Sequence, residues 1–279
     1  MMAAVVLALA ACGQDTPTAQ VPATTGGTTP PAAVDAGAGW KPAAEDTLQV
    51  QFSGEFDAEV EADIYDLDLF DTEAATIAAL HEQGKRVVCY ISVGSWEDWR
   101  PDAEDFPEEV IGKKYEGWPG ERWLDIRRID LLAPILGARL DLCAAKGFDG
   151  VEPDNVQVHD NDTGFPITAA DQHAFALWLV NEAHARGLAI GLKNAPDMAA
   201  ALAPCYDYAL VEDCAVYGWC GEMAPFIALG KPVFAIEYTD EQRDFEGACA
   251  TARALGLTMM LKHRDLDAWR EVCPPAAGG

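Results

Sequence analysis

The segment 147–156, which reads GFDGVEPDNV, joins an apolar, strand-like run to two carboxylates. Pro153 cannot donate a ladder hydrogen bond, so we expect regular strand pairing to stop there. Asp154 and Asn155 would then project from the strand end into a loop that a substrate can reach. The chain contains 46 Asp and Glu residues, so one acidic cluster by itself is weak evidence for catalysis.

Eight short apolar or alternating runs follow Trp40, and helix-like patterns that mostly end in glycine separate them. The predicted strands are 48–52, 64–70, 86–92, 148–152, 188–193, 206–212, 232–237 and 257–262. The predicted helices are 72–84, 129–147, 169–187, 222–230 and 240–256. Alternating strands and helices favour parallel pairing, and eight such units predict an α/β fold, a single (β/α)8 TIM barrel, with a doubly wound sheet as the alternative. No GxGxxG motif follows the first run, which argues against a dinucleotide site.

Polar residues finish nearly every predicted strand. In a barrel, active-site groups stand at the C-terminal strand ends, and polar side chains that face a core cost free energy unless they have partners. Any one of them can still be an exposed loop residue or half of a salt bridge. They are Asp66, Asp68, Tyr90, Ser92, Asp154, Asn155, Lys193, Asn194, Glu212, Asp213, Glu237, Tyr238 and Lys262.

Two carboxylates from different strands can support glycoside hydrolysis, in which one acid protonates the leaving oxygen and the other carboxylate attacks or activates water. Aromatic rings stack on sugar faces, and the long connection 97–128 holds Trp99, Trp118 and Trp123, directly after Trp96. Long connections on such a scaffold usually carry function. Ser95 lacks the second glycine of a nucleophile elbow, and the histidines show no metal-ligand spacing, so we expect neither a metal nor a cofactor.

The chain is strongly acidic, with 19 Lys and Arg against 46 Asp and Glu and a formal net charge of -27. Such a chain repels nucleic acid and anionic lipid and attracts cationic ligands, so we expect no nucleic-acid partner. Solubility alone explains the acidity equally well.

The first residues form a short apolar run that ends in Leu9-Ala10-Ala11-Cys12. This run resembles the lipobox of bacterial lipoprotein signal peptides, and the resemblance implies an exported chain with a lipid anchor on Cys12 in segment 1–12. The run is too short for a transmembrane helix, so the anchor would be the membrane contact. Residues 13–39 are rich in Thr, Pro, Ala and Gly and predict a flexible linker, which leaves a folded domain at 40–275. We expect a monomer at the cell surface, in the periplasm or secreted.

Seven cysteines follow Cys12 and none forms a CxxC pair, so a zinc ribbon is not expected. Beyond an export signal, disulfides are the natural interpretation. Cys214 and Cys220 fall in one predicted loop and are the best candidates for a local disulfide. The odd number leaves at least one thiol unpaired or wrongly assigned.

Five phrases of the chain resemble glycoside hydrolase family 114, the endo-α-1,4-polygalactosaminidases. They are YDLDLFD (65–71), VCYISVGSWEDWRPD (88–102), GWPGERWLDIR (117–127), GVEPDN (150–155) and GLKN (191–194). That family consists of secreted (β/α)8 barrels that act on α-1,4-linked galactosamine polymers, so the resemblance implies this fold and this polysaccharide substrate. Partly deacetylated polymers of this kind are cationic, which suits an acidic cleft.

The resemblance also implies roles for individual residues. Asp154 would be the nucleophile or the water-orienting carboxylate after strand four, and Glu212 the general acid/base after strand six. Glu152 lies two residues deeper and would support the site, while Lys193 would orient Asp154 and keep it ionised. The family usually has asparagine before this glutamate, where the chain has Val211, which should face away from the barrel interior. The expected substrate-binding residues are Asp66, Asp68, Tyr90, Ser92, Trp96, Trp99, Asp125, Asn155, Lys193, Asn194, Trp219, Glu237 and Tyr238.

Two other functions stay open at this point. One is a non-catalytic lipoprotein that binds polysaccharide with the same aromatic cleft, and the other is a hydrolase of a different α-linked glycan. A separation of the Asp154 and Glu212 carboxyl groups far above about 10 Å would argue against their pairing, and one near about 5 Å would favour retention over inversion.

Overall fold

The computed structural model describes residues 39–274 of the chain. The predicted signal segment 1–12, with Cys12, lies outside the described residues, together with all but the last residue of the predicted linker 13–39. The proposed domain limits 40–275 therefore stay a prediction.

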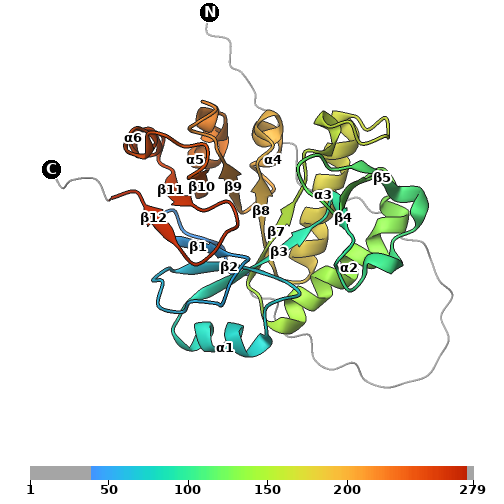
Figure 1. Ribbon diagram of the computed structural model, residues 1–279, viewed down its shortest axis with the longest axis horizontal. Helices are drawn as coiled ribbons and strands as arrows, with labels where there is room; N and C mark the ends of the chain where they lie inside the picture. Colours follow the sequence, from blue (N-terminus) through green and yellow to red (C-terminus); the bar gives the residue numbers. More distant parts are fainter. Residues whose placement is uncertain (1–38, 275–279) are drawn as a thin grey trace, which may run out of the picture.

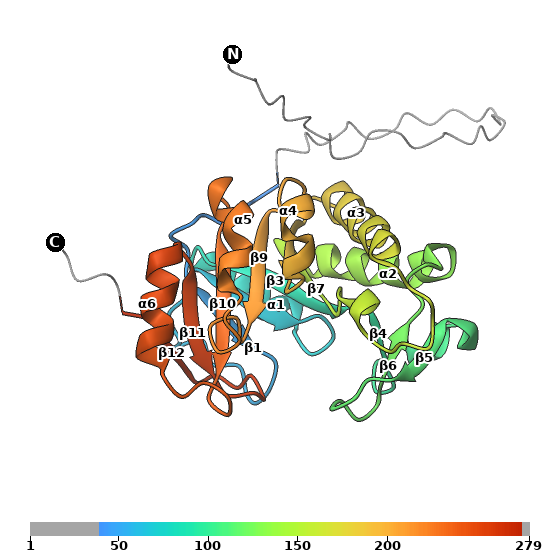
Figure 2. The ribbon, with the colours of Figure 1, turned by 90° about the horizontal axis from the view of Figure 1, so that it is seen from above.

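Eight parallel strands form a barrel that a ninth strand nearly closes (Figure 1, Figure 2). The parallel strands pair in the order in which they follow one another in the chain, and the ninth, β12, runs antiparallel to β11. The segment leading into β12 also contacts β1, because the Gln49 side chain donates to the Ala268 carbonyl oxygen at 2.9 Å. The strands are β1 (Leu48–Gln51), β2 (Ile64–Asp68), β3 (Arg86–Ser92), β7 (Gly150–Asp154), β8 (Ala189–Lys193), β9 (Tyr208–Glu212), β10 (Val233–Tyr238), β11 (Thr258–Lys262) and β12 (Arg270–Val272).

Helices connect the strands and pack on the outside of the barrel (Figure 1). Gly147 and Gly256 adopt the left-handed conformation directly after α2 and α6, where a glycine without a Cβ enters it at least cost. The predicted helix 222–230 is shorter than expected, since a 3₁₀ turn (Cys220–Met223) precedes α5, and the short α4 was not predicted. The helices are α1 (Ala74–Glu82), α2 (Ile129–Lys146), α3 (Ala169–Ala185), α4 (Ala199–Leu202), α5 (Ala224–Ala228) and α6 (Phe245–Leu255).

The core has two layers because side chains alternate between the two faces of each strand. An outer layer lies between strands and helices and includes Val151 and Val211, so Val211 faces away from the barrel interior as predicted. The same alternation turns Glu212 toward the inside. The inner layer consists of Leu48, Val50, Ile64, Val88, Ala189, Tyr208, Leu210, Phe234, Ile236, Tyr238 and Met260.

The long connection after β3 folds into a small antiparallel sheet in the order β4-β6-β5. Its strands are β4 (Ser95–Glu97), β5 (Ile111–Lys114) and β6 (Glu121–Leu124), and short 3₁₀ turns (Ala103–Asp105, Glu108–Val110) lie between β4 and β5. Figure 2 shows this inserted sheet standing beside the barrel, apart from the helices. It is anchored by buried charge, because Arg139 on α2 contacts Asp102 at 2.7 Å and donates to the Ser92 carbonyl oxygen at 2.7 Å.

The expectation that pairing stops at Pro153 was wrong on one side of β7. The ladder with β3 continues through Pro153 to Asp154, which pairs with Ser92. The ladder with β8 is recorded only for Gly150 and Val151. A proline removes one donor, so it interrupts pairing with the neighbour that its N–H would face and leaves the other neighbour in place. Asp154 is consequently the last strand residue rather than a loop residue.

Three disulfides join described residues: Cys89–Cys143, Cys214–Cys220 and Cys249–Cys273. The Cys214–Cys220 pair expected from the sequence is thus present. No cysteine between residues 39 and 274 is free, so the unpaired thiol that the odd count suggested is not found there.

Over the described range, none of the helices has both the length and the apolar character needed to cross a bilayer.

Candidate active site

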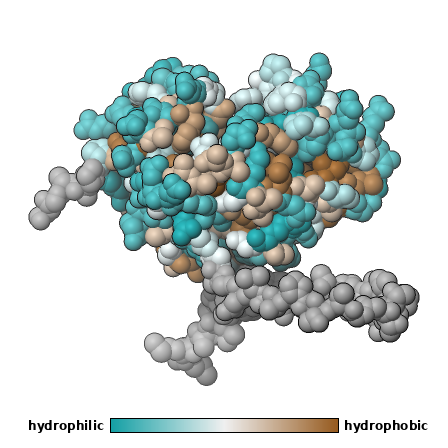
Figure 3. Space-filling view, turned by 90° about the horizontal axis from the view of Figure 1, so that it is seen from below, coloured by the Kyte–Doolittle hydropathy of each residue, from teal (hydrophilic) through white to brown (hydrophobic). Residues whose placement is uncertain are grey.

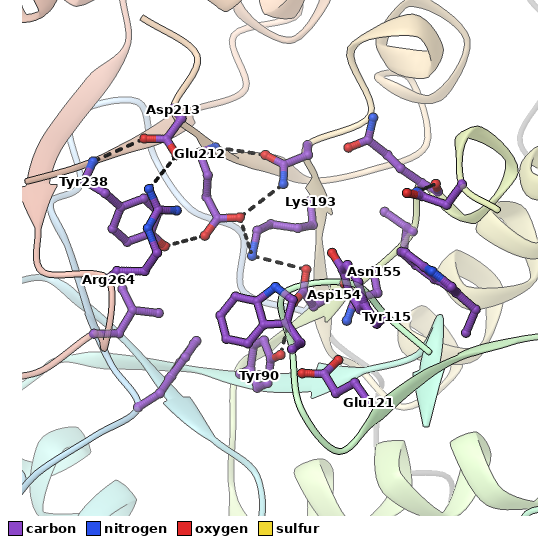
Figure 4. A pocket seen from close by; sticks show the side chains of 18 of the residues that line it. Tyr90, Tyr115, Glu121, Asp154, Asn155, Lys193, Glu212, Asp213, Tyr238 and Arg264 are labelled. Carbon is purple, nitrogen blue, oxygen red and sulfur yellow. Dashed lines mark hydrogen bonds and ion pairs between the residues drawn. The ribbon is translucent and has the colours of Figure 1, made fainter. Parts of the chain in front are cut away.

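A pocket of about 360 Å³ opens at the C-terminal ends of the barrel strands. We call it the main pocket. Figure 3 shows the surface notched between two lobes, and Figure 4 shows the main pocket from close by. It is lined by Phe52, Tyr90, Tyr115, Trp118, Glu121, Trp123, Asp154, Asn155, Val156, Gln157, Asn161, Lys193, Asn194, Glu212, Asp213, Tyr217, Tyr238, Arg264 and Leu266.

Lys193, the last residue of β8, is the charged centre of this pocket. Its Nζ lies 2.8 Å from Glu152 Oε1, 3.3 Å from Asp154 Oδ1 and 3.3 Å from Glu212 Oε2. Burial alone would lower the pKa of the Lys193 ammonium, but the surrounding carboxylates outweigh burial and raise this pKa well above its ordinary value. The ammonium therefore stays charged and holds three carboxylates from β7 and β9 together. Figure 4 shows its contacts to two of them, Asp154 and Glu212.

Asp154 ends β7 and reaches the pocket. The Tyr90 hydroxyl on β3 donates to Asp154 Oδ2 at 3.0 Å, and Lys193 holds the other oxygen. The Asp154 side chain is 19% exposed, whereas that of Glu152, two residues deeper on the same inward face, is 1% exposed. Of the two acidic residues on this strand, only Asp154 can touch a bound molecule.

Glu212 ends β9 and faces Asp154 across Lys193 (Figure 4). Asn194 donates to Glu212 Oε2 at 3.1 Å, and the Tyr238 hydroxyl donates to Oε1. Burial would raise the pKa of the Glu212 carboxyl, but Lys193 and the hydrogen bonds from Tyr238 and Asn194 outweigh it and lower this pKa below its ordinary value. Glu212 therefore favours its ionised form.

The two carboxylates are close enough to act on one bond. Asp154 Oδ1 and Glu212 Oε2 each lie 3.3 Å from the same nitrogen, so they are separated by at most twice 3.3 Å. This limit is well inside the roughly 5 to 9.5 Å over which paired carboxylates of glycoside hydrolases operate.

Three strand ends share one backbone feature. The residues that follow Asp154, Lys193 and Glu212 are Asn155, Asn194 and Asp213, and all three have positive φ values of 62°, 51° and 52°. Asn and Asp enter this left-handed region more readily than other residues with a side chain. The sharp change of direction ends each strand while the inward residue still points into the pocket. Such backbone conformations are concentrated at functional sites.

The inserted sheet supplies one wall of the main pocket, which we call the aromatic wall. It consists of Tyr115, Trp118, Glu121 and Trp123. The Tyr115 and Trp123 rings lie 4.1 Å apart between centroids. Burial, with the charges of Glu97 and Asp154, raises the pKa of Glu121 to about 7, against the hydrogen bond that Ser95 donates at 2.7 Å. A second pocket of about 870 Å³ shares three of these residues, Tyr115, Trp118 and Glu121, so the cleft continues along the sheet.

Seven of the fifteen expected catalytic or substrate-binding residues line the main pocket. Besides Asp154 and Glu212, these are Tyr90, Asn155, Lys193, Asn194 and Tyr238. Trp96 lines the second pocket. The other seven, Asp66, Asp68, Ser92, Trp99, Asp125, Trp219 and Glu237, line neither pocket.

Three of these seven are carboxylates that have structural partners instead. Asp68 and Asp125 are each held by an arginine at 2.7 Å, Arg100 and Arg127 respectively. Glu237 has the opposite parity to Tyr238, so it faces out of the barrel and accepts hydrogen bonds from the backbone N–H groups of residues 215 and 216. None of these three carboxylates is therefore available to a substrate: Asp68 and Asp125 are paired with arginines, and Glu237 points away from the cleft.

The remaining four are excluded by position. Asp66 is fully buried one step below Asp68, Ser92 is 1% exposed and bonds to Ser95, Trp99 is an exposed surface residue, and Trp219 packs on the outer core. Depth along the strand could not be judged from a polar residue's place in a run of sequence.

Sequence reasoning also missed residues that the fold brings to the pocket. The tryptophans of the connection 97–128 signalled the aromatic wall, but Glu121 within it was overlooked. Arg264 comes from the loop after β11, lies 4.1 Å above the Tyr238 ring and contacts Asp213 at 3.2 Å. No pattern in the sequence around Arg264 pointed to a site.

Comparison with known proteins identifies relatives of the whole barrel. The chain matches the model of glycoside-hydrolase family GH114 over residues 29–277. It is 39% identical to Aspergillus fumigatus Ega3, whose crystal structure is a complex with galactosamine; the match covers 84% of this chain and 97% of that one, with a TM-score of 0.80. The glycoside hydrolase domain of PelA from Pseudomonas aeruginosa shares the fold, at 16% identity and a TM-score of 0.63 over 81% of this chain and 97% of that one. An uncharacterized protein of Deinococcus radiodurans is 28% identical over 232 residues, which are 75% of this chain and 73% of that protein.

Proposed function

The chain belongs to glycoside hydrolase family GH114, and on that premise we propose that it cleaves α-1,4-galactosaminidic bonds inside a galactosamine-containing polysaccharide. The observation that carries this proposal is the Lys193 ammonium, which holds Asp154 and Glu212 from the fourth and sixth parallel strands at one pocket. The similar protein Ega3 was crystallised with galactosamine, which supports this sugar as the repeating unit.

In the proposed reaction Asp154 attacks the anomeric carbon, and Glu212 first protonates the leaving oxygen and then activates water. Lys193 contacts one oxygen of the attacking carboxylate and Tyr90 donates to the other, so together they fix its direction. Glu212 has to gain a proton before the first step, since Lys193, Tyr238 and Asn194 favour its ionised form. That proton comes from solvent, and Glu212 carries it more often as the pH falls.

The substrate is expected to be a cationic polymer. A net charge of -27 concentrates amine-bearing chains near the cleft. Inside it, Asp154 and Glu212 supply negative charge, Glu121 adds more above its pKa of about 7, and the aromatic wall offers ring faces to the sugars. The cleft continues past the main pocket into the second one, so a long chain can lie across the site, which suits cleavage within the polymer.

The test is hydrolysis of purified α-1,4-galactosaminan by the wild type and by Asp154→Asn and Glu212→Gln. We expect the wild type to release oligosaccharides and each variant to lose about 10²–10⁴-fold in kcat. Glu222→Gln, at an exposed glutamate outside the pocket, is the matched control and should keep wild-type activity. Binding of the polymer without hydrolysis by the wild type would favour the non-catalytic function, and activity only on another polymer of an α-glycan panel would change the substrate.

The same assay reports stereochemistry. The limit of twice 3.3 Å between the carboxylate oxygens includes the roughly 5 to 5.5 Å of retaining enzymes and only the lower edge of the roughly 6.5 to 9.5 Å of inverting ones. We therefore propose retention. Proton NMR during the first minutes of hydrolysis should show the α-anomer first, and early β-anomer would establish inversion.

We further propose that the chain is an exported monomer with a lipid anchor on Cys12, as its first residues suggest. Labelling with a radioactive fatty acid should mark the wild type and not Cys12→Ala. If the wild type takes up no label, the lipid anchor on Cys12 is wrong and only the export part of the proposal remains.

A further inference from the structure

Asp66 on β2 and Glu152 on β7 form a buried pair that the proposed reaction does not use. Only 0% and 1% of their surfaces are exposed, and neither lines the main pocket. Three of their oxygens, Asp66 Oδ1, Asp66 Oδ2 and Glu152 Oε2, are buried and accept no hydrogen bond from any N–H or hydroxyl group of the described residues. Buried ionised oxygens in such a position are strongly disfavoured, which favours a hydrogen shared within the pair.

The neighbouring donors are already engaged. Three carboxylates surround the Lys193 ammonium, which has three N–H groups, so none is left for Asp66. The Tyr208 hydroxyl donates to the Val151 carbonyl oxygen at 3.0 Å, and the Tyr90 hydroxyl donates to Asp154. Among the residues that the structure describes, the remaining source of a hydrogen is a protonated carboxyl group within the pair.

Asp66 rather than Glu152 carries that hydrogen. Burial raises the pKa of Asp66 well above its ordinary value, and the nearby charges of Glu152 and Asp154 raise it further. The hydrogen bond between the two carboxyl groups raises the pKa of Asp66 and lowers that of Glu152, as expected when Asp66 donates and Glu152 accepts. Glu152 in addition faces the Lys193 ammonium at 2.8 Å, which favours its ionised form.

We propose that Asp66 is a permanently neutral carboxylic acid whose hydrogen bond to Glu152 Oε2 fixes Glu152 beneath Lys193. Glu152 Oε1 then sets the position of the Lys193 ammonium, and through it the positions of Asp154 and Glu212. Asp66 is thus a positioning residue and not a substrate ligand. Its kinetic consequence rests on the proposed function; its protonation state does not.

Asp66→Asn and Asp66→Ala form the kinetic test. The asparagine amide can donate to Glu152 as the acid does, so Asp66→Asn should keep kcat within about threefold of the wild type and leave the pH profile in place. Asp66→Ala leaves Glu152 without its donor and should lower kcat by about 10- to 100-fold with KM nearly unchanged, because substrate does not reach this depth. If Asp66 is instead ionised, Asp66→Asn removes a charge beside Lys193 and shifts the pH profile, which would overturn the proposal.

An infrared difference spectrum tests protonation without any substrate. At neutral pH, the wild type minus Asp66→Asn should show the carbonyl stretch of a protonated carboxylic acid. Asp68→Asn is the matched control, because Asp68 is paired with Arg100 at 2.7 Å and its removal should show carboxylate bands instead. Carboxylate bands for Asp66 would refute the neutral Asp66, even if Asp66→Ala fails to fold. A wild type without hydrolase activity would refute the proposed function, but the infrared measurement would still decide the protonation state of Asp66.

Discussion

Protonation of Glu212 is set by single side chains around it. Lys193, Tyr238 and Asn194 lower its pKa against the effect of burial. The protonated fraction of Glu212 therefore falls as the pH rises through its lowered pKa, which lies below the ordinary pKa of a glutamate. If Glu212 is the general acid, kcat/KM, which reports the free enzyme, should therefore increase toward acidic pH.

Tyr238→Phe tests this assignment, because it removes one hydrogen bond that stabilises ionised Glu212. The pKa of Glu212 should then rise, and the limb of the kcat/KM profile that falls with increasing pH should move to higher pH. Tyr217→Phe, which removes an exposed hydroxyl from the same pocket, should leave the profile in place. A shift confined to the limb that rises with pH would make Glu212 the nucleophile.

Gly94 controls where Asp154 stands, through the residue after it. A Cβ on Gly94 would lie 1.7 Å from the Asn155 carbonyl oxygen, so an alanine there has to displace the end of β7. We expect Gly94→Ala to lower kcat by about 100-fold, the scale of a displacement of about 1 Å at a reacting group. Gly221→Ala is the control, since its Cβ would meet nothing within 4 Å. Wild-type kinetics for Gly94→Ala would mean that Asp154 does not need this backbone position.

The inserted sheet adds length to the binding cleft rather than chemistry. Trp118 is 49% exposed and lines both pockets, so its ring is available to successive sugars. One aromatic contact contributes about 0.5 to 1.5 kcal/mol. We therefore expect Trp118→Ala to raise KM for long polymer by about 2- to 10-fold, with little change in kcat. Trp269→Ala, which removes an exposed tryptophan outside both pockets, should have no such effect. Equal KM values for Trp118→Ala and wild type would place the sugars elsewhere.

Strand and helix positions were largely predictable because they depend on local pattern. The helices 129–147 and 169–187 begin at the predicted residues, and the glycines that end predicted helices supply left-handed turns at Gly147 and Gly256. The strand at 148–152 was misplaced by two residues, since the loss of one donor at Pro153 affects pairing with β8 and not with β3. Which neighbour a proline N–H would face is a property of the sheet.

The charge of the whole molecule should govern how fast cationic substrate arrives. With a net charge of -27, the chain attracts amine-bearing polymers over distances of about one Debye length, roughly 10 Å at 0.1 M salt. We expect added salt to lower kcat/KM on deacetylated galactosaminan and to leave kcat/KM on a fully N-acetylated polymer nearly unchanged. Titration of sodium chloride in parallel assays of the two polymers measures this, and equal salt dependence would show that the charge serves solubility alone.

The sequence by itself indicated the barrel and the family and placed Asp154 and Glu212 at strand ends, because periodicity, glycine placement and short motifs are properties of neighbouring residues. It also indicated that Lys193 serves Asp154. Tertiary structure decided which polar strand ends reach the cleft: Asp66 lies too deep, Glu237 faces outward, and Glu121 and Arg264 enter from elements outside the eight strands. Depth and facing depend on the relative register of all the strands and on where loops settle, and these follow from packing the whole barrel rather than from any local pattern.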